Sequence, residues 1–432
     1  MEIENGILPE VLAWIAIILA IYLTLYYKFL YSIIDPLFNW IISTAFASYF
    51  ATLVIPDVQD IYHFFGCQIA LWFGFVIAYC KNNIPSIKAE PAHNFSDQLL
   101  LRYTTYFLLS IYILSNIIIG YSKGFALFSD NPTLSKVEDF QGGFGLFRKI
   151  NWAAGKFTSS ALIYMYLIGG RRKDLIYFII VAIFSAVDGS KSALFGVITT
   201  IGVILYHPSF LYKKDLLTKT KRYIPIFLVG ALSISFVVLT KEKGSLNDAY
   251  LGFITRLLYS ADSLLYFYQP VNIDFFEKYS YVDYISVITN PILGFLRLQP
   301  YQEAVGNIMY DNLRTIDTGS EITVGPNAPF YIEGRIYFYY WGAFPFSMLI
   351  GYLYAKIRVY YLSIKNASAF YFVYVSCFFQ FATTLIGDVS LAVSLLFSLA
   401  FFVIPPYILI RLILYRKFTI RLKTNLIISF KI

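Results

Sequence analysis

Long apolar runs recur along the chain and predict membrane-spanning helices. A helix needs about 20 apolar residues to cross the hydrocarbon core, and somewhat fewer where flanking side chains reach the interface. Eleven runs fit this pattern, approximately at Leu8–Tyr27, Leu37–Ile55, Phe64–Cys80, Leu99–Ile119, Trp152–Ile168, Leu175–Val187, Ala193–Tyr206, Tyr223–Leu239, Trp341–Ala355, Ala369–Ile386 and Leu391–Ile410. Because three of them are short, we expect ten to twelve helices. The fold class predicted is all-α, a polytopic transmembrane helical bundle in which residues 1–432 form a single integral membrane domain.

Basic residues between the runs predict the orientation of the bundle. The connection "HPSFLYKKDLLTKTKR" holds five lysines and arginines against the single acid Asp215. Further basic clusters lie at Arg171–Lys173, at Lys356, Arg358 and Lys365, and in the C-terminal tail. Lysine and arginine collect on the cytoplasmic side of a membrane. Placing every cluster there puts the N-terminus outside and the C-terminus inside.

This orientation leaves two substantial connections outside, at residues 120–151 and 241–340. The larger one carries seven basic and eleven acidic residues, so it is net acidic. A structureless loop of that length is unusual, and "DAYLGFITRLLYSADSLLYFY" has the apolar spacing of an amphipathic helix. A second apolar piece, "YVDYISVITNPILGFL", is interrupted by Asn290 and Pro291. We therefore expect a large, partly helical outer loop with interfacial or re-entrant segments.

The composition supports a membrane protein and narrows its partners. Hydrophobic residues make up 58% of the chain and charged residues 14%, and the mean hydropathy is +0.63. The net charge of +8 is explained by the cytoplasmic clusters, so we expect the lipid bilayer as a partner and no nucleic acid. Cys67, Cys80 and Cys377 lie in or beside apolar runs without the paired spacing of a disulfide framework or a zinc site. The acidic N-terminus lacks the features of a signal peptide, so the first helix should be retained.

Standard catalytic signatures are absent from the sequence. It contains no HExxH, CxxC, Walker loop or GxSxG motif. The histidines are His63, expected on a short outer turn, and His93 and His207 on the inner side. A histidine base in the large outer loop is therefore excluded. No metal-ligand spacing appears either, so we expect no metal and no cofactor.

The best functional candidates are the basic residues on the outer side, where the positive-inside tendency does not place them. A guanidinium offers a rigid fork of donors that suits phosphate oxygens. An ordinary ion pair with a nearby acid is the alternative for each arginine, and for Lys191 in "DGSKSALFG" it is a cap on a helical hairpin. The candidates are Arg148, Lys191, Arg256, Arg297, Arg314 and Arg335.

Glu333 and Arg335 lie directly before an aromatic run at the lip of a predicted helix. Two residues apart, they cannot share one helical face, but both could reach into a cleft if the helix begins between them. Asp311, Asp317 and Glu321 are alternative carboxylates, and each of these acids could instead be a solvated loop residue. The aromatic run is either an interfacial anchor or a platform for sugars.

The pattern resembles the O-antigen polymerases, also called oligosaccharide repeat unit polymerases. The resemblance covers the whole arrangement of about eleven helices with one dominant outer loop. It is sharpest at "DGSKSALFG" and at "NAPFYIEGRIYFYYWGAFPFSMLIGYLYA", with Pro329, Glu333, Gly342 and Gly351. The resemblance implies a GT-C-like architecture in the bacterial inner membrane, with the active site facing the periplasm.

The resemblance also implies the reaction. The growing glycan would be transferred from undecaprenyl pyrophosphate to the non-reducing end of a new undecaprenyl-pyrophosphate-linked repeat unit, and a chain-length regulator and a flippase would be partners. Because a pyrophosphate leaving group needs charge neutralisation and an acceptor hydroxyl needs a base, we expect Glu333, Arg314 and Arg335 as catalytic residues. Arg256, Arg148, Arg297 and Lys191 would contact the pyrophosphate or the glycan.

Two other functions remain open. An O-antigen ligase shares the topology but is expected to use a histidine in its large outer loop, which this sequence lacks. A lipid-linked oligosaccharide flippase would be expected to have short loops and two related halves, and the loop of about a hundred residues argues against it.

Overall fold

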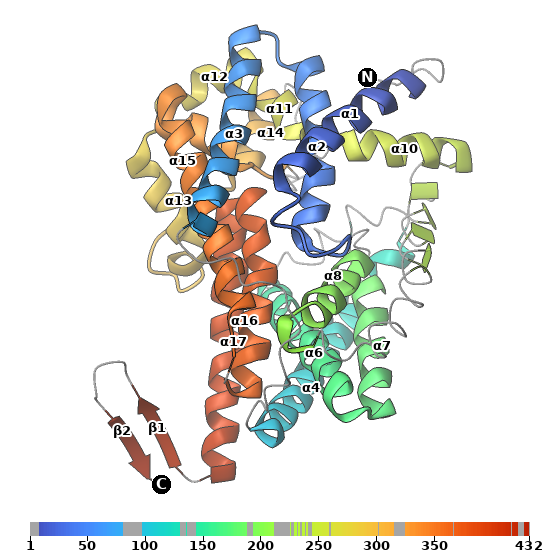
Figure 1. Ribbon diagram of the computed structural model, residues 1–432, viewed down its shortest axis with the longest axis vertical. Coiled ribbons are helices and arrows are strands. Elements are labelled where there is room, and N and C mark those ends of the chain that lie inside the picture. Colours follow the sequence, from blue (N-terminus) through green and yellow to red (C-terminus); the bar gives the residue numbers. More distant parts are fainter. Residues whose placement is uncertain are drawn as a thin grey trace. The chain divides into compact units, whose positions relative to one another are not determined.

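A computed structural model describes the chain at residues 8–80, 97–129, 144–187, 193–210, 244–258, 261–300, 302–314, 325–365, 367–415, 417–421 and 427–431, and at short stretches between 135 and 240 (Figure 1). The described chain is helical, which confirms the all-α prediction. A short antiparallel hairpin of β1 (Lys417–Arg421) and β2 (Ile427–Lys431) is the exception within these ranges.

The helices group into two compact units. The first comprises Met1–Lys88, Leu232–Ser363 and Phe379–Ser394. Its helices are α1 (Leu8–Tyr26), α2 (Pro36–Val54), α3 (Val58–Cys80), α10 (Leu246–Leu258), α11 (Asp262–Phe267), α12 (Pro270–Phe276), α13 (Tyr281–Leu293), α14 (Val305–Leu313) and α15 (Phe330–Leu362), with a 3-10 turn at Thr383–Ile386.

The second unit comprises Ala89–Ala231, Ile364–Phe378 and Leu395–Ile432. It contains α4 (Gln98–Lys123), α6 (Gly145–Gly169), α7 (Arg172–Val187) and α8 (Ala193–Leu205), with 3-10 turns at Ala126–Phe128 and Pro208–Phe210. Helices α16 (Ala369–Ala382) and α17 (Val389–Tyr415) contribute residues to both units.

Six of the described helical segments are long and apolar enough to cross a membrane. They are Leu8–Tyr26, Pro36–Val54, Val58–Cys80, Gln98–Phe128, Ala369–Ile386 and Val389–Tyr415. Each coincides with a predicted span. Helices α6, α7, α8 and α15 lie at four further predicted spans, and Tyr223–Leu239 falls largely outside the described residues. The total of ten to twelve helices stays a prediction.

The large connection at 241–340 is partly helical, as the sequence predicted. The amphipathic segment forms α10 and α11, and the second apolar piece forms α13. Helix α13 continues through Asn290 and Pro291. The Asn290 side-chain amide donates to the Gln302 carbonyl at 2.8 Å and accepts the Gln302 N–H at 3.1 Å, which ties the helix to the chain that follows it.

Helices α3 and α15 pack side by side at the centre of the first unit (Figure 1). They cross at two glycines: a Cβ on Gly74 would collide with the Met348 carbonyl oxygen, and one on Gly351 with the Leu71 carbonyl oxygen. Backbones can approach this closely only where side chains are absent. The crossing holds α3 against the part of α15 that contains Gly351.

Arg358, near the C-terminal end of α15, differs from a surface charge of a basic cluster. Arg358 was expected in a cytoplasmic basic cluster, but its side chain is fully buried. It forms a two-pronged ion pair with Asp35, donates from Nε to the Tyr79 hydroxyl at 3.0 Å, and contacts the Phe29 carbonyl oxygen. Asp35 also caps α2 by accepting the Leu37 N–H at 2.9 Å. Arg358 therefore serves the packing of three segments rather than a surface charge pattern.

Candidate functional site

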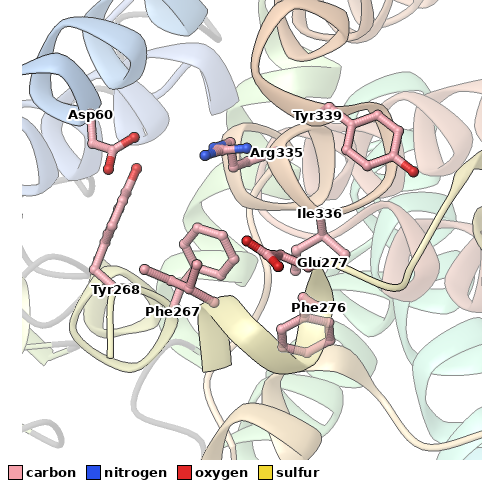
Figure 2. A pocket seen from close by; sticks show the side chains of 9 residues that line it. Asp60, Phe267, Tyr268, Phe276, Glu277, Arg335, Ile336 and Tyr339 are labelled. Carbon is pink, nitrogen blue, oxygen red and sulfur yellow. The ribbon is translucent and has the colours of Figure 1, made fainter. Parts of the chain in front are cut away.

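A pocket of about 330 Å³ lies in the first unit, where the connection between α10 and α15 packs on α3. Its polar lining residues are Asp60, Tyr268, Glu277 and Arg335 (Figure 2). Phe267, Ile273, Phe276, Ile336 and Tyr339 supply the remaining walls. The volume is at the small end of the range for ligand pockets. A few convergent polar groups on an aromatic lining are typical of a site that binds one polar unit, such as a sugar phosphate.

The wall formed by α11 and α12 is held by Asn272, whose side chain is fully buried. Its amide nitrogen donates to the Tyr266 carbonyl at 2.8 Å and to the Met309 carbonyl at 2.9 Å. The amide oxygen accepts from Asn312 of α14 at 2.9 Å. Proline at the first position of α12 presets the turn between Tyr268 and Glu277. The two side chains are thus presented from a cross-linked turn.

The opposite wall depends on a break in α15. Tyr339 has φ 60° and ψ −173°, so the helix consists of two parts that meet at this residue. Helix α3 braces the break: the His63 Nε2 atom lies 3.0 Å from the Tyr340 carbonyl oxygen, and the Tyr340 hydroxyl donates to the Gln59 carbonyl at 3.1 Å. These two contacts place the first turn of α3, which carries Asp60, opposite Arg335.

His63 itself differs from its expected place on a short outer turn. It lies within α3 and is only 2% exposed. Because α3 begins at Val58, six residues before the expected start, both Asp60 and His63 belong to the helix.

The polar side chains of the pocket make no hydrogen bond or ion pair with one another or with other described residues. Figure 2 shows the Asp60 carboxylate and the Arg335 guanidinium pointing toward each other, with the Tyr268 hydroxyl below Asp60 and Glu277 below Arg335. The Arg335 Nε atom is buried without a hydrogen-bond partner in the described structure, and its guanidinium lies 5.5 Å from the centre of the Tyr340 ring. An unpaired buried donor is costly, which makes Arg335 a candidate for contact with a ligand.

The structure separates Glu333 from Arg335, although both belong to the first turns of α15. The helix begins at Phe330, before both residues, rather than between them. Glu333 is 2% exposed and does not line the pocket. It accepts a hydrogen bond from the Tyr284 hydroxyl at 3.3 Å and one from the Val389 N–H, the first of α17, at 3.2 Å.

Glu333 shares the start of α17 with a second carboxylate. Asp388 caps this helix by accepting the Leu391 N–H at 2.7 Å. Burial raises the pKa of Glu333 well above its ordinary value, and the neighbouring Asp388 charge raises it further. Burial also raises the pKa of Asp388, to about 6. Together the two carboxyl groups hold the N-terminus of α17, where the helix dipole favours negative charge.

The other predicted basic residues do not line the pocket, or their side chains lie outside the described structure. Arg314 follows α14 and lies 3.8 Å from Asp311, in the ion-pair arrangement expected as the alternative. Arg297 is exposed on a turn after α13, with φ 57°. Arg148 lies in α6 of the second unit, 4.5 Å from the centre of the Trp152 ring. Arg256 belongs to α10, but its side chain is outside the described structure, as are Lys191, Asp317 and Glu321.

Sequence reasoning missed Asp60, Tyr268 and Glu277. Asp60 precedes the apolar run used to place the third helix, and Tyr268 and Glu277 resemble any residues of an amphipathic connection. One signal was present: Asp60 is a charged residue within a few positions of a membrane-length run, where charges tend to be functional.

Within the described ranges, no group of three or more histidine, cysteine, aspartate or glutamate side chains could hold a metal ion. Comparisons with protein families, with curated proteins and with solved structures found no match to this chain.

Proposed function

We propose that the protein is a polymerase of lipid-linked oligosaccharide repeat units. It would transfer a growing glycan from undecaprenyl pyrophosphate to the non-reducing end of a new lipid-linked repeat unit, at the periplasmic face of a bacterial inner membrane. The product would be an O-antigen or a related surface polysaccharide, and the pocket lined by Arg335 would be the active site.

The observation that carries the proposal is Arg335, a partly buried arginine that lines a pocket without an ion pair among the described residues. A guanidinium left unpaired in a pocket favours an anionic ligand. The aromatic residues Phe267, Tyr268 and Tyr339 beside it suit a sugar ring, and Asp60 and Glu277 can accept hydrogen bonds from sugar hydroxyls. A chain of membrane-length helices suits a substrate with a lipid anchor.

The test is a gel of surface polysaccharide from cells that lack the gene and carry wild-type or variant copies. Deletion should reduce the polysaccharide ladder to a single repeat unit on the lipid core, and the wild-type copy should restore it. Arg335→Ala should fail to restore it while the protein stays in the membrane at wild-type amount. Lys278→Ala is the matched control, because Lys278 is an exposed cation directly after Glu277. A wild-type ladder with Arg335→Ala would refute the assignment of the pocket.

The same gel separates the alternative functions. Loss of all attached repeats, with lipid-linked polymer accumulating, would indicate a ligase. Lipid-linked repeat units trapped on the cytoplasmic side would indicate a flippase. Against a histidine-dependent ligase, the connection at 241–340 contains no histidine, and His63 lies against the Tyr340 carbonyl oxygen.

A further inference from the structure

We infer that Asp60 is the general base of the transfer, the group that accepts the proton of the attacking sugar hydroxyl. The inference rests on the proposed function and deepens it, because it places the two halves of the reaction on opposite walls of one pocket. Arg335 of α15 would hold the pyrophosphate, and Asp60 of α3 would face the acceptor sugar.

Among the described residues, Asp60 makes no contact that stabilises the start of α3. An acid in the first turn of a helix often caps it, but here Asp57 is the cap. Its side chain accepts the Gln59 N–H at 2.9 Å, and its carbonyl oxygen accepts the Ile61 N–H at 3.1 Å. The Asp60 carboxylate accepts no hydrogen bond within the described structure. A carboxylate that lines a pocket without a structural partner is available to a ligand.

The arrangement of the two side chains lets Arg335 bind the pyrophosphate while Asp60 accepts the proton of the acceptor hydroxyl. Their charged groups point toward each other across the pocket but are too far apart to form an ion pair (Figure 2). Direct pairing would neutralise both groups, whereas a gap leaves room for the reacting atoms between them. Both residues stand on helices that are packed together at the crossing of Gly74 and Gly351 and, at the break in α15, by the contacts of Tyr340 with His63 and Gln59, and a rigid support of this kind suits general base catalysis.

The other two carboxylates near the pocket fit this task less well. Glu333 is buried and already accepts the N–H of Val389 and the hydroxyl of Tyr284. Glu277 lines the pocket but is exposed, and it caps the C-terminal end of the short helix α12. Glu277 is better suited to accept hydrogen bonds from sugar hydroxyls that do not react.

The step proceeds as follows. The acceptor oxygen forms a bond to the anomeric carbon of the donor sugar while the bond from that carbon to the pyrophosphate oxygen breaks. The electron pair of the broken bond leaves with the pyrophosphate, whose charge Arg335 stabilises. The proton of the acceptor hydroxyl passes to the Asp60 carboxylate, which later releases it to water. No oxidant, reductant or further reactant is required.

The test compares Asp60→Asn with Asp57→Asn in the deletion strain. Asparagine keeps the size of both side chains, and at position 57 it can still cap α3. Asp57→Asn should restore the wild-type ladder. Asp60→Asn should slow chain extension by about 10²-fold or more, the usual contribution of a general base. It should also leave lipid-linked single repeats accumulated.

A binding measurement separates chemistry from a loss of folding or affinity. Undecaprenyl pyrophosphate is titrated into each purified protein in detergent micelles. Asp60→Asn should bind this probe with wild-type affinity, whereas Arg335→Ala should lose at least tenfold. A wild-type ladder with Asp60→Asn would overturn the inference, as would loss of the ladder only with Glu277→Gln or Glu333→Gln. If Arg335→Ala also gives a wild-type ladder, the proposed function itself has failed at this pocket.

Discussion

Replacing Tyr339 with glycine tests whether the break in α15 stores backbone strain. At φ 60° and ψ −173°, Tyr339 occupies a region that is essentially restricted to glycine, and a residue held there costs on the order of 1–3 kcal/mol. The side chain is 53% exposed, so truncating it removes little buried surface. Tyr339→Ala keeps the strain, because alanine retains Cβ, whereas Tyr339→Gly relieves it. We expect the glycine variant to be more stable than the alanine variant by about 1–3 kcal/mol.

The comparison needs a position where the backbone is an ordinary helix. Leu349 lies in the continuous part of the same helix and is 50% exposed. At this position glycine should be the less stable variant: Leu349→Gly should have a free energy of unfolding about 1 kcal/mol lower than Leu349→Ala, because glycine is the poorer helix former. The free energy of unfolding is measured for all four variants by titrating the purified protein in mild detergent with dodecyl sulfate. If glycine is less stable than alanine at both positions, Tyr339 holds no strain and the reasoning is refuted.

The strained residue also lines the pocket, which links stability to activity. Strain that persists at a site is usually tied to what the site does. We expect Tyr339→Gly to shorten the polysaccharide ladder although it is more stable than Tyr339→Ala, because the aromatic wall is lost. Tyr339→Phe, which keeps both ring and backbone, should give wild-type chain lengths.

Three further predictions concern the packing of the helices. Gly74→Ala should lower the free energy of unfolding by about 1–3 kcal/mol, because the new methyl group meets the backbone of α15. Gly387→Ala should be nearly neutral in the same detergent titration, because the new methyl group would lie 3.8 Å from the nearest atom, the Thr384 carbonyl oxygen, which is an ordinary contact. Arg358→Met should cost about 3–5 kcal/mol by leaving the buried Asp35 charge unpaired, and adding Asp35→Asn should recover most of it in a double-mutant cycle. Because the pKa of Asp388 is raised from 3.8 to about 6, the folded protein favours its protonated form, and stability should fall as pH rises from about 4 to 6, by at most about 3 kcal/mol. Asp388→Asn should reduce this dependence in unfolding measured across that pH range, leaving the part that comes from the raised pKa of Glu333, and an unchanged pH profile would contradict the prediction.

The helices could be read from the sequence because their signal is local. An apolar run of 17 to 20 residues specifies a span by itself, and α1, α2 and α17 begin within a few residues of the predicted positions. Helix α15 shows the limit of this signal. Its first nine residues include Glu333, Gly334 and Arg335, so they do not form an apolar run, yet tertiary packing makes them helical. The predicted start at Trp341 lies just after the break at Tyr339, where the longer apolar stretch begins.

The pocket could be predicted only in part, because its residues come from three distant segments. Arg335 was predicted from its charge, because the positive-inside tendency gives no reason for a cation on the predicted outer side. Asp60 lies about 275 positions earlier in the chain, and nothing in the local sequence connects the two. Their proximity follows from the glycine crossing of α3 and α15 and from the contacts of Tyr340 with His63 and Gln59 at the break in α15, and such contacts leave only a faint trace in the sequence.

Glu333 illustrates why residue type at a membrane lip does not settle a role. A carboxylate there can contact a substrate, or it can accept the unpaired N–H groups at the start of another helix. The sequence is the same in both cases, and the two roles differ only in the direction in which the side chain points. Two residues along a helix amount to a turn of about 200°, so Glu333 and Arg335 leave α15 on opposite sides. One reaches the N-terminus of α17 and the other the pocket. Under the proposed function, the carboxylate that faces Arg335 across the pocket is therefore Asp60 of α3 rather than Glu333.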